Sequence, residues 1–262
     1  MLTSTEGVGQ LLSAVVRAGA RGIVLGVGGS ATNDLGLGAL SALGLKFLDG
    51  NGRPCPSLAP KYWIKIAGIE GKVRNDLPSI CIACDVANPL LGANGAAAIY
   101  GPQKGLNSYD RASLESQSAR MAGLLSSHFQ RPLSLAKQPG TGAAGGIAFG
   151  LMCATGAQLV GGSALVSSWL NLDARLKRAD IVVTGEGRFG PDSFSGKGPG
   201  VIAKQALKWG KRVHVFCGTS GDIGKRAGLF VHEITPLHTP LAVALQRCPA
   251  NLAKATERIF TS

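Results

Sequence analysis

The segment from Gly26 to Asp34, Gly-Val-Gly-Gly-Ser-Ala-Thr-Asn-Asp, constrains the fold of this chain more than any other. It follows an uncharged run, Ile23-Val24-Leu25, and precedes an apolar segment with helical spacing at 37–43. Glycines at the carboxyl end of a strand let backbone N–H groups approach an anion, and a following helix N-terminus adds partial positive charge. The alternative is a tight strand-to-helix turn with an Asx-type cap, since glycine-rich turns of this kind are common in α/β proteins.

Three further polar, glycine-rich segments have the same character. They are 83–90, followed by 101–105; 139–146; and 183–188, followed by 195–197. In open parallel sheets, ligands bind beyond the carboxyl ends of the strands. Four such segments therefore predict that separate loops converge on one anion-binding crevice at one edge of a parallel sheet.

The spacing of apolar residues predicts alternating strands and helices, hence an α/β fold with a parallel sheet and right-handed crossovers. A composition shift near residue 170 marks the expected domain boundary. The expected helices are 8–17, 33–43, 108–129, 145–154, 163–170, 172–177, 200–209 and 240–258. The expected strands are 22–27, 45–48, 63–69, 80–84, 181–184, 213–216 and 230–234.

The charge balance favours small anionic ligands. The formal net charge is +12, which attracts phosphates and carboxylates. Nucleic acid is disfavoured because the basic residues are scattered and only three Trp and three Tyr are available for stacking. The uncharged stretch between Lys137 and Asp173 is rich in glycine, so a buried helix pair is expected there rather than a membrane span. Cys81 and Cys84 form a CxxC pair inside an apparent buried strand, which indicates small core residues and a cytoplasmic protein rather than a zinc site.

Five runs of the sequence, taken together, resemble the type I glycerate kinases. The matching runs are GGSATND at 28–34, ACDVANPL at 83–90, GANGAAAIYGPQKG at 92–105, PGTGAAGG at 139–146 and IVVTGEGR at 181–188, with SGKGPGVIA at 195–203 as a looser match. The similarity runs in register from about Thr3 to the C-terminus.

The resemblance implies phosphorylation of D-glycerate with ATP and Mg²⁺, with 2-phosphoglycerate as the product. It implies two α/β domains: an inserted one at 1–170, and at 171–262 the C-terminal part of a discontinuous flavodoxin-like one with a parallel sheet. Glycerate and ATP are the implied partners, a cytoplasmic location is implied, and a homodimer is compatible with the family.

The chain also departs from the family pattern. Full-length members begin with a segment carrying an Asp-Ser-Phe/Tyr-Lys loop and an Asp-Gly-Gly-Glu-Gly loop, and neither sequence occurs here. The resemblance therefore implies a chain that lacks the family's N-terminal segment and an incomplete flavodoxin-like domain. After Arg188 the family usually has Asp two positions on, where this chain has Gly190, and Leu35 replaces a usual Gly.

Phosphoryl transfer mainly requires positioning and positive charge around the moving group. No Walker A sequence is present, so the glycine-rich segments would have to hold the phosphates. Asp85 and Asp34 are the candidate catalytic residues, and Asp85 and Glu186 the candidate Mg²⁺ ligands. A helix cap is the alternative for Asp34, and solvated lysines are the alternative for Lys104 and Lys197. The candidate substrate- and nucleotide-binding residues are Gly28, Gly29, Ser30, Thr32, Asn33, Asn88, Lys104, Gly142, Gly145, Gly146, Thr184, Gly185, Glu186, Gly187 and Lys197.

Two other functions compete with a glycerate kinase. One is a non-catalytic remnant of that family. The other is an NAD(P)-dependent oxidoreductase, since Gly26, Gly28 and Ala31 fit a GxGxxG/A pattern and Asp49 follows a second strand at a plausible distance for a ribose contact.

Overall fold

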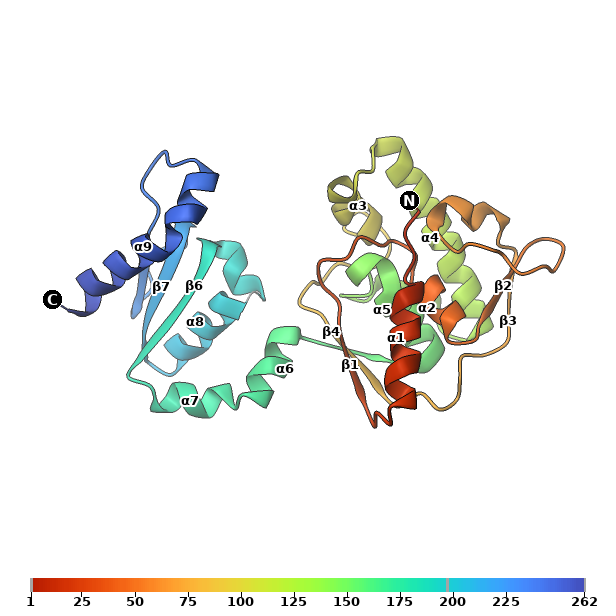
Figure 1. The fold of residues 1–262 in the computed structure, drawn as a ribbon, viewed down its shortest axis with the longest axis horizontal. Coiled ribbons are helices and arrows are strands. Elements are labelled where there is room, and N and C mark those ends of the chain that lie inside the picture. Colours follow the sequence, from red (N-terminus) through yellow and green to blue (C-terminus); the bar gives the residue numbers. More distant parts are fainter. Residues whose placement is uncertain (1, 197, 262) are drawn as a thin grey trace. The chain divides into compact units, whose positions relative to one another are not determined.

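The computed structural model describes residues 2–196 and 198–261, so the predicted phosphate ligand Lys197 lies outside the described residues. The chain divides into two compact units, Met1–Gly162 and Ser163–Ser262 (Figure 1). Each unit holds its own three-stranded parallel sheet, which confirms the predicted α/β class. That the first unit is an inserted domain, and that the second completes a discontinuous one, stays a prediction.

The first unit is organised around the sheet β1-β4-β5, in which Val24 lies opposite Cys81 and Cys81 lies opposite Gln158. Parallel strands need long crossovers, and here the crossovers carry the helices. Leu40 and Phe149 are among the fully buried side chains of the resulting core. The described helices and strands of this unit are α1 (Glu6–Arg17), β1 (Ile23–Gly26), α2 (Leu37–Ala42), β2 (Lys46–Leu48), β3 (Gly68–Glu70), β4 (Ile80–Ala83), α3 (Ala96–Tyr100), α4 (Ser108–His128), α5 (Ala143–Thr155) and β5 (Gln158–Val160).

Three expectations for the first unit are corrected. The predicted strand 63–69 is wrong: Pro60–Lys65 forms a 3₁₀ turn, with Trp63 fully buried and its Nε1 donating to the Leu58 carbonyl, and only β3 remains. The helix expected at 33–43 begins only at Leu37, because Leu35 and Gly36 have left-handed backbone φ values of 51° and 77°. The short strand β5 was not predicted at all.

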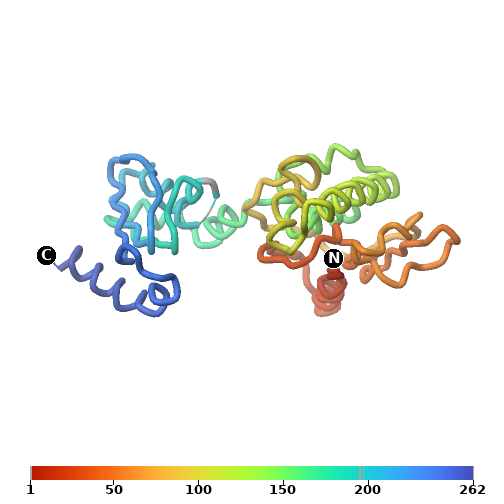
Figure 2. The backbone as a smooth tube through the Cα atoms, turned by 90° about the horizontal axis from the view of Figure 1, so that it is seen from above, coloured from red at the N-terminus to blue at the C-terminus, as the bar shows by residue number. Residues whose placement is uncertain are grey.

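The second unit is organised around the sheet β6-β7-β8, with Thr184 opposite Val215 and Val215 opposite Val231. Successive side chains of a strand point to opposite faces. Val213 and Val215 of β7 belong to the core that includes α8, whereas His214 contacts Phe260 of α9, so α8 and α9 cover opposite faces (Figure 2). The described elements are α6 (Gly162–Trp169), α7 (Leu172–Arg178), β6 (Ile181–Phe189), α8 (Gly198–Lys208), β7 (Arg212–Ser220), β8 (Leu229–Glu233) and α9 (Leu241–Phe260).

Three expectations that involve the second unit are also corrected. The segment 185–188 is not a loop, because β6 continues to Phe189 and Arg188 still lies opposite Thr219 of β7. It belongs to a different sheet from the other three segments, so the prediction of a single sheet edge is wrong. The prediction of a buried helix pair between Lys137 and Asp173 is half wrong. Most of α5 is buried, but no described residue of α6 is buried and Trp169 is 64% exposed. Among the described residues, no helix combines the length and apolarity needed to cross a membrane.

Candidate functional site

Three of the predicted segments come together in the first unit. Gly26, Ala83 and Val160 lie opposite one another at the carboxyl ends of β1, β4 and β5, and the N–H groups of Val27 and Cys84 extend this pairing into the loops. The third segment follows a 3₁₀ turn rather than a strand and leads into α5. We call residues 26–34, 83–90 and 139–146 the loop cluster. The convergence expected from the sequence is therefore present for these three segments.

Glycines at three positions hold the loop cluster together. A Cβ at Gly145 would overlap the Thr32 carbonyl oxygen, and one at Gly142 would overlap the Pro89 carbonyl oxygen. At Gly146, whose φ is +89°, a Cβ would lie 2.7 Å from Leu90 Cδ1. All three glycines are buried. They therefore pack the segments against one another beneath the surface, where they do not face a ligand.

The glycines at the outer edge of the loop cluster, unlike these packing glycines, face solvent. Gly28 and Gly29 are exposed, with no atom within 4 Å of a Cβ built on either, and Gly29 has a φ of +61°. Within the described chain, the backbone N–H groups of Gly28, Gly29 and Ser30 donate no hydrogen bond. Successive backbone N–H groups around a left-handed residue form a concave anion-binding nest. This edge matches the anion site expected at the end of β1.

Lys104 reaches this edge from 74 residues away in the sequence. Its Nζ donates to Ser30 Oγ at 3.2 Å, to the Thr32 carbonyl at 2.7 Å and to Asn33 Oδ1 at 3.3 Å. Burial lowers the pKa of Lys104, while the nearby Asp34 carboxylate acts in the opposite direction. The lysine thus fixes the loop and places its charge beside Ser30. This geometry favours a ligand-binding role for Lys104 over the alternative of a freely solvated lysine.

Asp85 lies at the surface of the cluster. Its side chain is exposed, and a Cβ at Gly162 would lie 3.1 Å from Asp85 Oδ2, so the carboxylate lies beside the chain that follows β5. The side chain of Asn88 instead stabilises the loop through two hydrogen bonds. Tyr100 Oη donates to Asn88 Oδ1 at 2.6 Å, and Asn88 Nδ2 donates to the Asn94 carbonyl. Sequence analysis missed Tyr100 and Gly162, whose roles depend on contacts between distant segments.

Asp34 lies inside the first unit and is fully buried. Its carboxylate accepts hydrogen bonds from Thr5 N at 2.6 Å, Thr5 Oγ1 at 2.8 Å, Gly36 N at 3.2 Å and Gly38 N at 3.3 Å. Burial raises the pKa of Asp34, and these hydrogen bonds to the ionised form act in the opposite direction. The geometry favours the helix-cap alternative, since these donors fix the start of α2 and the N-terminus of α1.

Four predicted residues of the second unit line one cavity. Thr184, Gly185, Glu186 and Gly187 of β6 form one wall of a space of about 730 Å³. Glu186 Oε1 is buried and has no hydrogen-bond partner among the described residues. The opposite wall includes Leu241, Leu245, Cys248 and Leu252 of α9, which lie within the helix expected at 240–258 but were not expected to line a site.

The oxidoreductase alternative fails on topology. A ribose-binding acid of a dinucleotide fold follows the strand that neighbours the first glycine-rich strand in the parallel sheet. Here Asp49 follows β2, which pairs antiparallel with β3 in a separate two-stranded sheet. Its Oδ1 accepts from the backbone N–H groups of Asn51 and Arg53, so Asp49 closes a local turn.

A pair of histidines lies on the face of the second sheet that α9 covers. His214 Nδ1 and His232 Nε2 are 3.0 Å apart, and the rings of Phe230, Phe216 and Phe260 surround them. Burial lowers the pKa of both histidines, with Arg212 adding to the effect at His214, and His214 and Arg258 adding to it at His232. The folded unit therefore favours their neutral forms.

Acidification is expected to destabilise the second unit through this pair. The unfolded chain takes up protons near pH 6.5, whereas the folded chain resists them, so the contribution is present above that pH and is lost below it. Urea titrations at pH 7.5 and 5.5 should show a loss of roughly 1 kcal/mol, allowing for partial solvent screening. The loss should be smaller in His232→Gln and unchanged in His238→Asn, an exposed histidine outside the pair. An equal loss in His232→Gln and wild type would contradict this account.

Comparison with known proteins gives one consistent family. A family model described as the glycerate kinase family matches residues 1–262. The chain is 37% identical over 229 residues to the glycerate 2-kinase of Escherichia coli (strain K12), covering 86% of this chain and 59% of that one. It is 38% identical over 267 aligned positions to the glycerate kinase of Halalkalibacterium halodurans, covering 98% of this chain and 69% of that one.

A solved structure agrees with this family assignment. The crystal structure of a protein from Salmonella typhimurium LT2, provisionally named glycerate kinase 2, superposes with a TM-score of 0.73 at 32% sequence identity. The match covers 98% of this chain and 71% of that one. The chain spans 59% of the length of its Escherichia coli relative.

Proposed function

The chain belongs to the glycerate kinase family, and on that premise we propose that it transfers the γ-phosphoryl group of ATP to a hydroxyl of D-glycerate. The name of the Escherichia coli relative, glycerate 2-kinase, favours 2-phosphoglycerate as the product. Kinases are phosphotransferases whose catalysis consists mainly of positioning and charge stabilisation. The loop cluster of the first unit is suited to that task.

The observation that carries the proposal is the set of N–H groups at Gly28, Gly29 and Ser30 that donate to no described residue, with the Lys104 ammonium beside them. Both glycerate and ATP are anions. Backbone donors hold carboxylate or phosphate oxygens without a moving side chain, so they cost little reorganisation during the reaction. Three hydrogen bonds from Lys104 keep this edge of the loop in place.

Asp85 is the group best placed to act on a substrate hydroxyl. It is an exposed carboxylate just beyond the carboxyl end of β4, and Gly28–Ser30 follow the carboxyl end of the neighbouring parallel strand β1 at the same edge of the sheet. A carboxylate in hydrogen-bond reach of a hydroxyl accepts its proton as the oxygen attacks phosphorus. We assign Asp85 this role and assign Asp34 to the structure of the unit.

The residues of the second unit fit the magnesium ion that such a reaction uses. No described group of three His, Cys, Asp or Glu side chains could hold a metal ion. Mg²⁺ bound to nucleotide phosphates needs only one or two carboxylates, with phosphate oxygens and water completing the shell. Glu186 Oε1, which is buried without a hydrogen-bond partner in the described part of the chain, supplies such an oxygen, so we propose Glu186 as its protein ligand. When bound, the ion would neutralise phosphate charge.

An assay of glycerate-dependent ADP release tests the proposal. Asp85→Asn should lower kcat about a hundredfold, because it removes the proton acceptor while leaving the side-chain volume nearly unchanged. Glu70→Gln neutralises an exposed carboxylate on β3 of the same unit and should leave the rate unchanged.

Each other outcome has a definite meaning. Undiminished turnover in Asp85→Asn would remove Asp85 from the mechanism. Absence of glycerate-dependent ADP release from the wild-type chain, with ATP still bound, would favour the non-catalytic remnant.

A further inference from the structure

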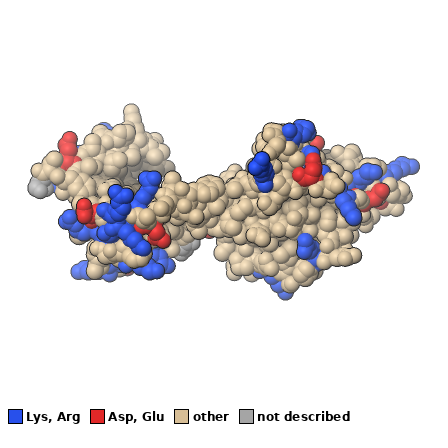
Figure 3. Space-filling model, turned by 90° about the horizontal axis from the view of Figure 1, so that it is seen from below, with Lys and Arg blue, Asp and Glu red and all other residues tan. Residues whose placement is uncertain are grey.

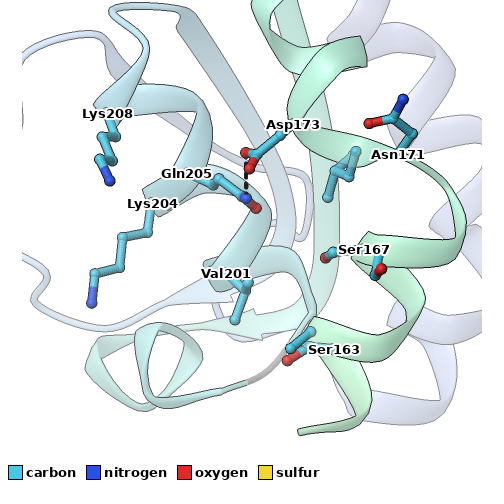
Figure 4. A pocket seen from close by; sticks show the side chains of 11 residues that line it. Ser163, Ser167, Asn171, Asp173, Val201, Lys204, Gln205 and Lys208 are labelled. Atoms are coloured by element: carbon cyan, nitrogen blue, oxygen red, sulfur yellow. Dashed lines mark hydrogen bonds between the residues drawn. The ribbon is translucent and has the colours of Figure 1, made fainter.

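A second cavity of the second unit lies outside everything assigned so far. It measures about 770 Å³ and lies between α8 and the helices α6 and α7 (Figure 4). Ser163, Ser167 and Asn171 line one side, and Lys204 and Lys208 line the other. It shares no residue with the cavity beside Glu186. Its volume is in the range that accommodates a small-molecule ligand.

The charge of this cleft is unbalanced. Lys204 and Lys208 are one helical turn apart on α8, both are exposed, and neither makes an ion pair with a described residue. Figure 4 shows both side chains extending from the same side of the helix. Among the described lining residues the single acid is Asp173, which already accepts from Gln205 Nε2 at 2.6 Å and from Trp209 Nε1 at 3.4 Å. The lining therefore offers two ammonium groups against one engaged carboxylate.

The surroundings strengthen this positive potential. Residues 163–262 contain fourteen Lys and Arg against seven Asp and Glu. Lysine and arginine side chains gather on this unit in Figure 3, and the ammonium of Lys177 lies 4.1 Å from the centre of the Trp209 ring. A concave site with a surplus of one charge concentrates ligands of the opposite charge.

The polar groups select among anions. Serine hydroxyls and lysine ammonium groups donate hydrogen bonds, and phosphate oxygens are strong acceptors in several directions. Lysine acts as a point charge on a flexible stem, so a pair of lysines tolerates a chain of phosphates without fixed geometry. A ligand that spans the cleft could place phosphates against Lys204 and Lys208 and a polar group against Ser167 and Asn171.

We propose that this cleft binds a small ligand bearing two or more phosphates. The shared chemistry is the polyphosphate group, which either a nucleotide or a free polyphosphate supplies. The inference stands on the lining of the second unit alone and does not depend on the proposed glycerate kinase activity.

Titration with inorganic tripolyphosphate, without Mg²⁺ and at constant ionic strength, tests the proposal. Calorimetry should show saturable binding, and the component that belongs to this cleft should amount to one equivalent per chain, apart from any binding at the loop cluster of the first unit. The fluorescence of Trp209, which is hydrogen-bonded to Asp173, should change along the same curve. The double variant Lys204→Gln/Lys208→Gln should weaken binding about tenfold or more, since two charge-assisted contacts are lost. In the binding component that this double variant weakens, tighter binding of ATP than of tripolyphosphate would identify a nucleotide as the source, and equal binding a free polyphosphate.

The matched control removes the same charge elsewhere in the unit. Lys225 and Lys254 are exposed and lie outside the cleft, so Lys225→Gln/Lys254→Gln should leave binding unchanged. Equal weakening by both double variants would overturn the proposal in favour of non-specific attraction. Equal binding of citrate would overturn the selectivity for phosphate. Competition by a DNA duplex at lower concentration than tripolyphosphate would instead indicate a nucleic-acid surface.

Discussion

Gly145→Ala is expected to lower the free energy of unfolding of the first unit by roughly 3–5 kcal/mol, which combines overpacking with a strained backbone. The new Cβ would overlap the Thr32 carbonyl oxygen, and Gly145 has a φ of +71°, which an alanine adopts only with strain. Both effects act where residues 26–34 pack against residues 139–146. Urea unfolding followed by circular dichroism measures the loss.

The loop cluster supplies its own controls, because four glycines separate the two effects. Gly28 has neither a neighbour within 4 Å of its Cβ position nor a positive φ, so Gly28→Ala should be nearly neutral. Gly29 has a φ of +61° but open space, so Gly29→Ala should cost about 1 kcal/mol. Gly142 has a φ of −80° but a blocked Cβ, so Gly142→Ala should cost about 1–3 kcal/mol.

The order of these costs is the test. If Gly145→Ala destabilises the unit no more than Gly29→Ala, the close approach of the loops does not exist in solution. If Gly28→Ala and Gly29→Ala cost no more than about 1 kcal/mol but weaken glycerate or ATP binding, the division between packing glycines and ligand-facing glycines is supported.

Much of the fold was predictable from local sequence. The helix at Ser108–His128 and the strands at Ile23–Gly26 and Ile80–Ala83 follow from the spacing of apolar residues. The helix also begins at a side-chain cap, because Asn107 accepts a hydrogen bond from Asp110 N at the start of α4. Local patterns failed where two structures fit the same residues. The run 63–69 had strand propensity, but the 3₁₀ turn that begins at Pro60 extends to Lys65 and takes up its first three residues.

The site was less predictable, because glycine has two uses that look alike in a sequence. Gly28 leaves backbone N–H groups open to a ligand, whereas Gly145 lets two backbones touch, and only the neighbouring chain distinguishes them. The same limit applies to charged residues. Nothing local indicates that Lys104 bonds to Ser30, or that Thr5 donates to Asp34 from 29 residues away.

Asp34→Ala is expected to be about as damaging as Gly145→Ala, with a loss of about 3–5 kcal/mol in the free energy of unfolding. The variant leaves the buried N–H groups of Thr5, Gly36 and Gly38 without an acceptor. It also opens space between α1 and α2, where Thr5 Oγ1 in turn accepts from Ala39 N at 3.0 Å. Chemical denaturation at pH 7.5 measures the loss.

Two variants isolate the cause of that loss. Asp49→Ala removes a carboxylate that also accepts two backbone N–H groups, but in an exposed turn, and should cost only about 1 kcal/mol. Thr5→Val keeps the Asp34 carboxylate and the backbone donors while removing one hydroxyl, and should cost about 1–2 kcal/mol.

The pH dependence of the difference between wild type and Asp34→Ala identifies the carboxylate itself. Burial raises the pKa of Asp34. Above a pH of about 3.9, the folded unit therefore still holds a proton on this carboxyl, whereas the unfolded chain has released it. This contribution is complete at low pH and is lost as pH rises through the raised pKa, so the stability advantage of wild type should grow as pH falls from 7.5 to 5. A constant advantage over that range would show that the hydrogen bonds outweigh burial and keep Asp34 ionised, whereas a cost of Asp34→Ala no larger than that of Asp49→Ala would show that Asp34 is not a buried cap. Its carboxylate would then return as a candidate for the chemistry assigned to Asp85.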